Sequence, residues 1–530
     1  MVGRIAFVAL AGFAAVGMAS PAAARTCGEI ARLHLEKGKI TAAEPVAAGA
    51  FVPPATPFGP PPGVSSGLYK GLPAFCRVRA TLAPTPDSDI KVEIWLPEKG
   101  WNGKFVGVGN GIWAGQISYS QMGEPLARGY AVASTDTGHS GNGLTAEWAV
   151  GHPEKLIDFA YRAVHVMTVT AKQVVRDFFG AAPRTSLWNS CSTGGRQGLM
   201  AAYRYPDDYD AISAMAPANP MTDLMTQTMW TGYQALRSPA AALPPTKLAL
   251  VHKAVVAQCD AEDGLKDGLI SLPGVCRFDP ASLQCKPGQK TGCLDADQVA
   301  AMRNIYGGVR DAKTGAQLLP GFPRGSEMQL ATLLDGPEPF PVATSYFRLL
   351  VFADQPNWDW RKMNYARDLA RARQYGAAML DIPADGLAPF FARGGKLLLS
   401  HGWTDGLIPA NNTVAFYRRL HAATPAEARQ SVRLFMVPGM NHCRGGEGPS
   451  SFDTLGVIDH WATHKVAPNR IIASRPAALP GEAARPPLTR PLCPFPLIAR
   501  YRGDGSPNEA KNFVCAPAAT HSGSRGRPAP

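Results

Sequence analysis

The stretch Ser190-Cys191-Ser192-Thr193-Gly194-Gly195 decides the fold that we expect for this chain. It follows a short apolar run of strand character, 186–188, and opens a run of helical character that includes 196–203. A serine on a tight turn from strand to helix, with small neighbours, is typical of a nucleophile elbow, in which the next N–H points at a developing oxyanion. Ser190 stands where the usual pattern has glycine, so an ordinary glycine-rich helix start is the alternative.

Runs of apolar residues on both sides of this stretch have the lengths and spacings of strands and helices. The helical spacing occupies 159–179, and the strand-like runs are 90–96, 105–108, 130–134, 396–400 and 433–437. Strands that alternate with helices are typical of an α/β fold with a mostly parallel sheet. We therefore predict an α/β fold of this kind.

The segment 219–393 lacks this alternation. It is rich in Pro, Gly and Trp and holds four of the cysteines. We interpret it as an inserted lid domain. It would divide the catalytic core into a first part, 25–218, and a second part, 394–517.

Both ends of the chain have a composition different from that of the core. Arg4 precedes a 14-residue apolar run, Ile5 to Met18, and Ala22-Ala23-Ala24 follows as a cleavage site. This pattern predicts a signal peptide, residues 1–24, cleaved near Ala24, and a periplasmic or secreted protein. The run is too short for a membrane span, and no later segment reaches about 20 apolar residues. The tail, 518–530, has almost nothing to bury, so we expect it to be disordered.

The composition favours a folded protein with a large core. Hydrophobic residues make up 45% and charged residues 18% of the 530, which argues against disorder and against a long coiled coil. The 53 Lys and Arg exceed the 41 Asp and Glu by 12, but no run of five or more positive residues occurs. Binding along the phosphates of a nucleic acid typically uses such a run, so we expect no nucleic-acid partner.

Two later residues complete a catalytic arrangement with Ser192. In this fold class the acid and the base follow the nucleophile in the order Asp, His, in loops after later strands. Asp405 follows the strand-like run 396–400, and His442 follows the run 433–437. Each alone has an ordinary explanation, since Asp-Gly is a turn signal and a loop histidine is commonly solvated. Together, their order and context indicate the triad Ser192, Asp405 and His442.

A second oxyanion donor is expected from a loop after an early strand. The residues 107–112, Gly-Val-Gly-Asn-Gly-Ile, meet this need. The N–H groups of Gly111 and Ile112 are both candidates, and the N–H of Thr193 is the expected partner of either. The stretch does not fit a phosphate-binding loop, because no helical pattern follows it directly.

All ten cysteines lie beyond the cleavage site. An even number in an oxidising compartment favours disulfides over metal thiolates, and no C-x-x-C spacing occurs. Cys191 precedes Ser192 and Cys443 follows His442. A hydrogen bond between the nucleophile and the base would therefore bring these cysteines within reach of a disulfide, whose Cα atoms lie about 5.5 to 6 Å apart. The alternative is that Cys191 and Cys443 are unrelated and only happen to flank these two residues.

Carboxylates are concentrated in the segment 259–269, Cys-Asp-Ala-Glu-Asp-Gly-Leu-Lys-Asp-Gly-Leu. Hard oxygen ligands at this density suit calcium, although the spacing is not that of an EF-hand. The alternatives are a calcium cage of another kind and a solvated acidic turn.

These motifs resemble a known family. The pair Cys191-Ser192, Asp405 and the pair His442-Cys443 look like the CS-D-HC motif of the tannase and feruloyl esterase family of α/β-hydrolases, which includes the hydrolase of mono(2-hydroxyethyl) terephthalate. Further similar stretches are 101–105, 136–139, 437–443 and 490–494. The resemblance runs from Cys27 to about Cys515 and is weakest in the insertion.

The resemblance implies an α/β-hydrolase fold, the same triad, a structural calcium ion and a set of disulfides. The calcium ligands would be the carboxylates of Asp260, Asp263 and Asp267 and the carbonyls of Leu265 and Leu269. The implied disulfides are Cys27 with Cys76, Cys191 with Cys443, Cys259 with Cys276, Cys285 with Cys293, and Cys493 with Cys515.

We therefore expect an exported serine esterase that forms an acyl-enzyme and acts on small esters of hydroxylated aromatic acids. The alternatives are a serine peptidase or amidase, which uses the same parts, and a calcium-dependent binding module on an inactive hydrolase core. The insertion offers apolar walls and a cation for an aromatic acid, although core packing explains these residues equally well: Tyr346, Phe347, Arg348, Trp358 and Trp360.

Overall fold

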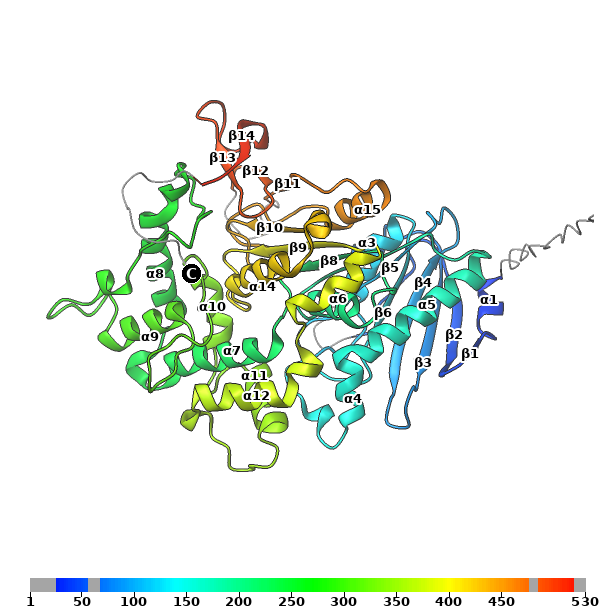
Figure 1. Ribbon diagram of the computed structural model, residues 1–530, viewed down its shortest axis with the longest axis horizontal. Helices are drawn as coiled ribbons and strands as arrows, with labels where there is room; N and C mark the ends of the chain where they lie inside the picture. The colour runs from blue at the N-terminus through cyan, green and yellow to red at the C-terminus, as the bar shows by residue number, and fades with distance from the viewer. Residues whose placement is uncertain (1–24, 56–66, 476–484, 519–530) are drawn as a thin grey trace, which may run out of the picture.

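A ten-stranded sheet forms the centre of the computed structural model, which describes residues 25–55, 67–475 and 485–518 (Figure 1). The expected signal peptide and residues 519–530 of the expected tail lie outside the described residues. In spatial order the strands are β1 (His34–Leu35), β2 (Gly38–Val46), β3 (Phe75–Leu82), β4 (Ile90–Pro97), β6 (Ala131–Thr135), β5 (Lys104–Gly107), β7 (Thr185–Cys191), β8 (Ala211–Met215), β9 (Lys396–Gly402) and β10 (Val432–Val437).

The sheet has a parallel part and an antiparallel arm. From β6 through β5, β7, β8 and β9 to β10 every neighbouring pair is parallel, whereas β1 to β4 and the pair β4 and β6 are antiparallel. Parallel strands covered on both faces need apolar residues at nearly every position, and every residue of β6 is buried. At the other side β2 alternates in exposure, as an outer strand with one solvated face does. The predicted α/β fold is therefore confirmed.

Helices cover both faces of the sheet. One face packs against α5 (Ala163–Phe179), α6 (Thr193–Arg204) and α14 (Ala410–Ala423), and the other against α3 (Tyr119–Ala127) and α15 (Thr454–His464). In α5 the buried Val164, Met167, Ala171 and Val175 recur at intervals of three or four, which places them on one side of the helix. The helical run expected at 159–179 begins with a π-helical turn at Asp158–Arg162.

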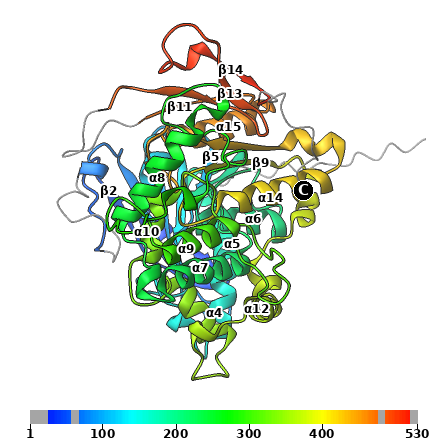
Figure 2. The ribbon, with the colours of Figure 1, turned by 90° about the vertical axis from the view of Figure 1, so that its left-hand side faces the viewer.

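The connection from β8 to β9 consists of helices and loops. Its α helices are α7 (Met221–Leu236), α8 (Pro245–Cys259), α9 (Ala296–Gly307), α10 (Glu327–Leu334), α11 (Pro341–Ser345), α12 (Tyr365–Leu380) and α13 (Ala388–Ala392). Figures 1 and 2 show α7 to α10 gathered at one end of the sheet. Helices α7 and α10 lie over the edge at which β7 ends, because both contribute to the same cavity as the residue that follows β7.

Two small antiparallel sheets follow the last helix. One pairs β11 (Ile471–Ser474) with β12 (Thr489–Leu492), and the other pairs β13 (Ile498–Tyr501) with β14 (Phe513–Ala516). The second lies at the top of Figure 1. The disulfide between Cys493 and Cys515 links the end of β12 to β14, so these strands of four residues are held by a covalent bond as well as by pairing.

Candidate active site

Ser192 lies on a sharp turn between β7 and α6. Its backbone has φ 65° and ψ −128°, in a region that residues with a side chain rarely adopt. The Ser192 N–H donates to the carbonyl of Met215 at the end of β8, 2.9 Å away, which holds the turn against the sheet. Strand, strained serine and helix follow in the order of a nucleophile elbow.

Contacts explain why the elbow has glycine at position 194 and serine at position 190. A Cβ at Gly194 would lie 2.0 Å from Ser190 Oγ and 3.2 Å from the Gly109 Cα, so only glycine fits there. Ser190 takes the place of the usual first glycine, and its hydroxyl donates to Gln121 Oε1 at 2.8 Å. The polar side chain is therefore accommodated by a specific partner from α3.

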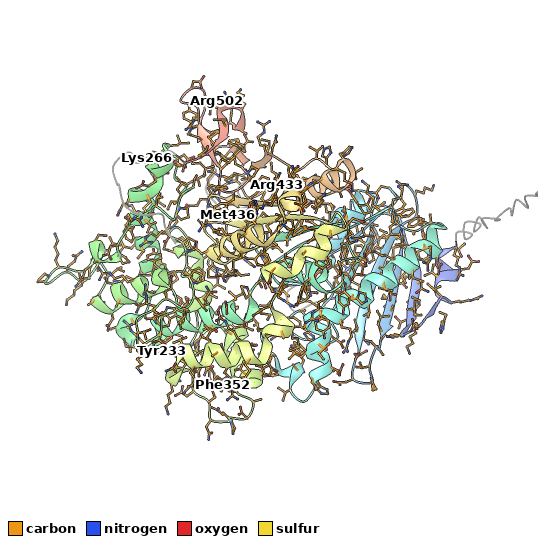
Figure 3. The ribbon with its side chains drawn as sticks, in the orientation of Figure 1. Tyr233, Lys266, Phe352, Arg433, Met436 and Arg502 are labelled. Carbon is orange, nitrogen blue, oxygen red and sulfur yellow. A yellow bond between two sulfur atoms is a disulfide. The ribbon has the colours of Figure 1, made fainter. Side chains whose placement is uncertain are left out.

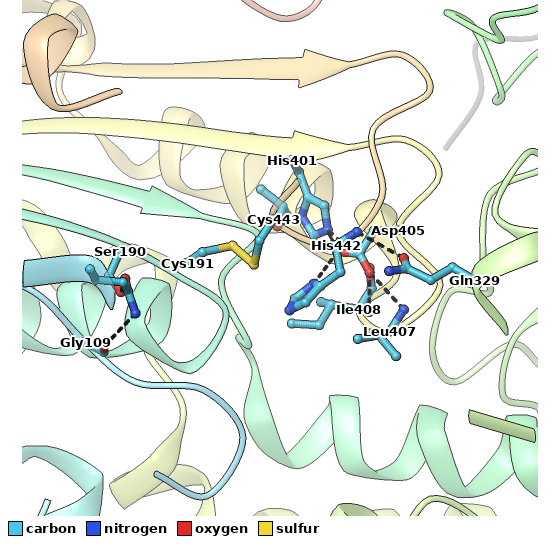
Figure 4. The surroundings of a disulfide bond; sticks show 12 residues. Gly109, Ser190, Cys191, Gln329, His401, Asp405, Leu407, Ile408, His442 and Cys443 are labelled. Carbon is cyan, nitrogen blue, oxygen red and sulfur yellow. Dashed lines mark hydrogen bonds and ion pairs between the residues drawn. A yellow bond between two sulfur atoms is a disulfide. The ribbon is translucent and has the colours of Figure 1, made fainter. Parts of the chain in front are cut away.

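Asp405 and His442 come together from the loops that follow β9 and β10. His442 Nδ1 lies 2.7 Å from Asp405 Oδ2. The backbone N–H of His442 donates to Gln329 Oε1 of α10 at 3.0 Å, and Gly406 N–H donates to the same oxygen at 2.9 Å. A helix of the insertion thus holds both loops, as Figure 4 shows.

Asp405 is fully buried and accepts four hydrogen bonds. Besides His442, its donors are the N–H groups of Leu407 at 2.8 Å and Ile408 at 2.9 Å and the Nε2 of His401 at 3.0 Å. Burial alone raises the pKa of this carboxyl, but the charges and hydrogen bonds of His442 and His401 outweigh it, and the net pKa lies below its usual range. Asp405 therefore stays ionised and fixes the imidazole of His442 with Nδ1–H toward it.

His401 is a second histidine on the same carboxylate that sequence reasoning missed. It is completely buried, and its Nδ1 lies 2.7 Å from Thr413 Oγ1. Because ionised Asp405 only accepts hydrogen bonds, Nε2 of His401 must carry a proton. The spacing of four residues between His401 and Asp405 is the signal in the sequence, but it carries no information about burial.

A disulfide joins the residue before Ser192 to the residue after His442. The S–S bond between Cys191 and Cys443 is 2.07 Å long and the Cα atoms are 5.9 Å apart. Ser192 and His442 both line one cavity, without a direct hydrogen bond between Ser192 Oγ and His442. Such bonds are often long in free enzymes and shorten when substrate binds.

The loop after β5 is fastened to the elbow. Thr193 Oγ1 donates to the Ile112 carbonyl at 2.7 Å, and Gly194 N–H donates to the Asn110 carbonyl at 2.8 Å. Gln197 Nε2 also donates to Asn110 Oδ1 at 3.0 Å. Gly111, Ile112 and Thr193, the three residues expected to supply oxyanion donors, all line the cavity that holds Ser192.

The cavity has a volume of about 570 Å³ and is mostly apolar. This size suits a small organic molecule. Helix α7 supplies Met221, Leu224 and Met225, and the insertion also supplies Phe340 and Val342. The arrangement combines a serine, a histidine paired with a carboxylate, and an apolar binding space, which is what acyl transfer on an apolar substrate requires.

The aromatic residues expected to shape the substrate site lie elsewhere, so that interpretation is wrong. Tyr346, Phe347 and Trp360 are buried in the core of the insertion, and Trp358 stacks with Phe352 at 5.5 Å between ring centroids. Figure 3 labels Phe352 at the lower edge of the insertion. The exposed Arg348 pairs with Glu338 at 3.0 Å. Large aromatic side chains stabilise a fold most when they pack against each other away from water, and these side chains do so.

The acidic loop after α8 folds around Asp260. The Asp260 carboxylate accepts from the N–H groups of Gly268 at 2.9 Å and Leu269 at 3.2 Å, and Asp267 Oδ2 accepts from Arg490 at 2.6 Å. The loop therefore lies against the C-terminal strands, and Figure 3 shows Lys266 on the same side as Arg502. In the described ranges no three His, Cys, Asp or Glu side chains converge as metal ligands.

The carboxylates of this loop are crowded. Burial, followed by the negative charges of Asp267 and Asp260, raises the pKa of Asp263 to about 6, although hydrogen bonds from Ser271 and Leu265 oppose this. Asp267 also has a raised pKa, again with burial as the main cause. Half-buried like charges of this kind suit a nearby cation.

The ten cysteines form five disulfides, in the same pairs that the resemblance implies, and the described residues contain no free cysteine. Five disulfides suit an oxidising compartment. None of the helices within the described ranges is long and apolar enough to cross a membrane.

Comparisons with known proteins agree with the geometry. The sequence profile "Tannase and feruloyl esterase" matches residues 76–516. An uncharacterised esterase of Xanthomonas campestris is 33% identical, over 96% of this chain and 94% of that protein. A probable feruloyl esterase B-1 of Aspergillus flavus is 31% identical, over 83% of this chain and 86% of that protein.

Solved structures show the same fold. The crystal structure of feruloyl esterase B from Aspergillus oryzae superimposes with a TM-score of 0.83 at 28% identity, over 92% of this chain and 99% of that one. The tannin acyl hydrolase from Aspergillus niger superimposes with a TM-score of 0.72 at 20% identity, over 91% and 92%, and supports the fold alone. The chain therefore belongs to the tannase and feruloyl esterase family, and it is a carboxylic ester hydrolase with an α/β-hydrolase fold.

Proposed function

We propose that this protein is an exported serine esterase that hydrolyses small esters of hydroxylated aromatic acids through an acyl-enzyme. The observation that carries the proposal is the meeting of Ser192, on its strained turn, with the hydrogen-bonded pair His442 and Asp405 at one apolar cavity. The expected signal peptide and the five disulfides support export.

The proposed reaction has two halves. His442 Nε2 accepts the hydroxyl proton of Ser192 while Oγ bonds to the ester carbonyl carbon, and the N–H of Thr193 with that of Gly111 or Ile112 binds the oxyanion. The carbon–oxygen bond to the alcohol then breaks, and His442 returns the proton to the departing oxygen. Water repeats the sequence: it gives a proton to His442, attacks the acyl carbon, and releases the acid as Ser192 Oγ regains its proton.

The helices of the insertion act as a lid in this proposal. Leu333, Phe340 and Val342 of the insertion line the same cavity as Ser192, and Gln329 of α10 holds the His442 loop. Excluding water from such a site strengthens each electrostatic interaction in it. The lid therefore supports both substrate binding and catalytic geometry.

We further propose that the acidic loop binds a structural calcium ion. The donor chemistry fits, because Asp260, Asp263 and Asp267 crowd negative charge at one loop and oxygen is the donor that calcium prefers. The carbonyls of Leu265 and Leu269 would complete the set. When bound, the ion supplies charge neutralisation and cross-links the loop, and the chemical step uses only the triad and the oxyanion donors.

A fluorophosphonate probe tests the proposed mechanism. It should label Ser192 covalently, and Ser192→Ala should abolish labelling and lower kcat on methyl ferulate by a factor on the order of 10⁶, with an unchanged circular dichroism spectrum. Ser190→Ala is the matched control, since this serine lies two residues before Ser192, near the end of β7, and bonds to Gln121. It should keep the labelling.

Two results would contradict the proposal. An unlabelled wild-type protein that still binds calcium would favour a binding module, and labelling combined with cleavage of amides but not esters would favour a peptidase. A panel of gallate, hydroxycinnamate and terephthalate monoesters then identifies the acyl group.

A further inference from the structure

The wall of the active-site cavity carries one permanent charge. Among the described residues that line it, Arg444 is the only lysine, arginine, aspartate or glutamate. Its guanidinium has no hydrogen bond or ion pair with any other described residue, unlike Arg348, which pairs with Glu338, or Arg373, which pairs with Asp223. A charge without a partner in the protein is available for a ligand.

The backbone holds Arg444 close to the catalytic base. Cys443, fixed by its disulfide, has φ 64°, and the Arg444 N–H donates to the His442 carbonyl at 2.8 Å. The next turn is closed by the Asn441 N–H, which donates to the Gly445 carbonyl at 3.2 Å. The cation is therefore attached to a rigid turn, although its side chain is exposed.

The position of Arg444 indicates which part of an ester it meets. The apolar wall of the cavity is deeply buried, with Met221 2%, Leu224 4% and Val342 4% exposed, so it suits the aromatic acyl group. Arg444 is exposed and lies two residues after His442, the residue that protonates the departing alcohol. Arg444 thus lies on the alcohol side.

We propose that this site prefers esters whose alcohol portion carries a carboxylate, and that Arg444 binds that carboxylate. The inference rests on the proposed ester hydrolysis and adds the chemistry of the second half of the substrate. A guanidinium binds a carboxylate through two parallel hydrogen bonds, and no acidic side chain lines the described part of the cavity to repel it. Because Arg444 is exposed, the expected preference is modest, about fivefold.

Two esters of one acid test the proposal. Caffeoylquinate has an alcohol portion with a carboxylate, and methyl caffeate has the same acyl group with a neutral alcohol. We expect Arg444→Gln to lower the ratio of their kcat/KM values about fivefold, mainly through the KM of caffeoylquinate, and Arg444→Lys to restore part of it. In the wild type, 0.5 M NaCl should lower the same ratio, since salt screens an exposed pair. Arg348→Gln, an exposed arginine outside the cavity, should leave the ratio unchanged.

Each other outcome has a definite meaning. An unchanged ratio in Arg444→Gln overturns the proposal, and so does an equal loss for both esters, which would indicate a structural role. A fall in the ratio of monomethyl to dimethyl terephthalate, without a fall for the caffeates, overturns the assignment to the alcohol side. If wild type hydrolyses neither caffeate, the proposed function fails, and titration calorimetry of both esters on Ser192→Ala still shows whether Arg444→Gln removes the preference.

Discussion

The disulfide between Cys191 and Cys443 offers the sharpest test of how this fold supports its site. The perturbation is the double variant Cys191→Ala, Cys443→Ala. The two residues are 252 positions apart in the sequence, so the chain-entropy model gives a loss of about 5.5 kcal/mol of unfolding free energy. The two shorter disulfides enclosed by this loop change the value little, because the dependence on loop length is logarithmic.

The effect on catalysis is a separate quantity. The disulfide holds the Cα atoms of the two neighbours of Ser192 and His442 at 5.9 Å. Without it, only noncovalent contacts such as the Gln329 to His442 hydrogen bond position the base, and a displacement of about 1 Å costs roughly 10²-fold in rate. We expect the double variant to lose about 10²-fold in kcat on methyl ferulate.

The assay separates these two effects with a matched control. Cys285→Ala, Cys293→Ala removes a disulfide that spans only 8 positions, for which the same model gives about 2.5 kcal/mol, and neither residue lines the cavity. Urea midpoints report stability, and kcat is measured where circular dichroism shows each variant folded. If the first variant keeps near-normal kcat, or loses no more than the control, the positioning argument is refuted.

Two further predictions concern stability. Removing calcium with a chelator should lower the melting temperature more than it lowers initial rates at low temperature, and Asp263→Asn should mimic it; an immediate reversible loss of activity at unchanged stability would instead indicate a catalytic metal. His252 lies 2.8 Å from Glu327 and 3.3 Å from Glu447. Burial alone lowers its pKa, but both carboxylates raise it to about 9, so its contribution of about 3 kcal/mol is complete below pH 6.5 and lost as pH rises through 9. The urea midpoint of the wild type should therefore be lower at pH 9.5 than at pH 6. His252→Gln should remove this difference. An equal dependence of the midpoint on pH in the wild type and the variant would contradict the assignment.

Local patterns in the sequence predicted the parts of the fold that depend on local properties. Strands β4, β5, β6, β9 and β10 lie within a residue or two of the expected runs, because a buried strand needs apolar residues wherever it is covered. The elbow was recognisable because its turn requires small residues at fixed offsets from the serine. The positions of Ser192, Asp405 and His442 in the sequence were also informative, because loops that follow parallel strands share one edge of the sheet.

The tertiary structure alone decided what these residues touch. The antiparallel arm β1 to β3 and the last two small sheets went unpredicted, because short half-exposed strands have weak periodicity. Four donors converge on Asp405, among them His401, whose burial depends on the packing of α14 against β9.

The substrate cavity shows this division most clearly. The sequence offered Arg348 beside an aromatic run, yet packing turned the aromatic side chains into a core and paired Arg348 with Glu338. Arg444 is an equally ordinary arginine in the sequence, and it reaches the cavity because a disulfide and a tight turn place it beside His442. Residue type and spacing are local properties, whereas the environment of a side chain depends on contacts between segments far apart in the chain.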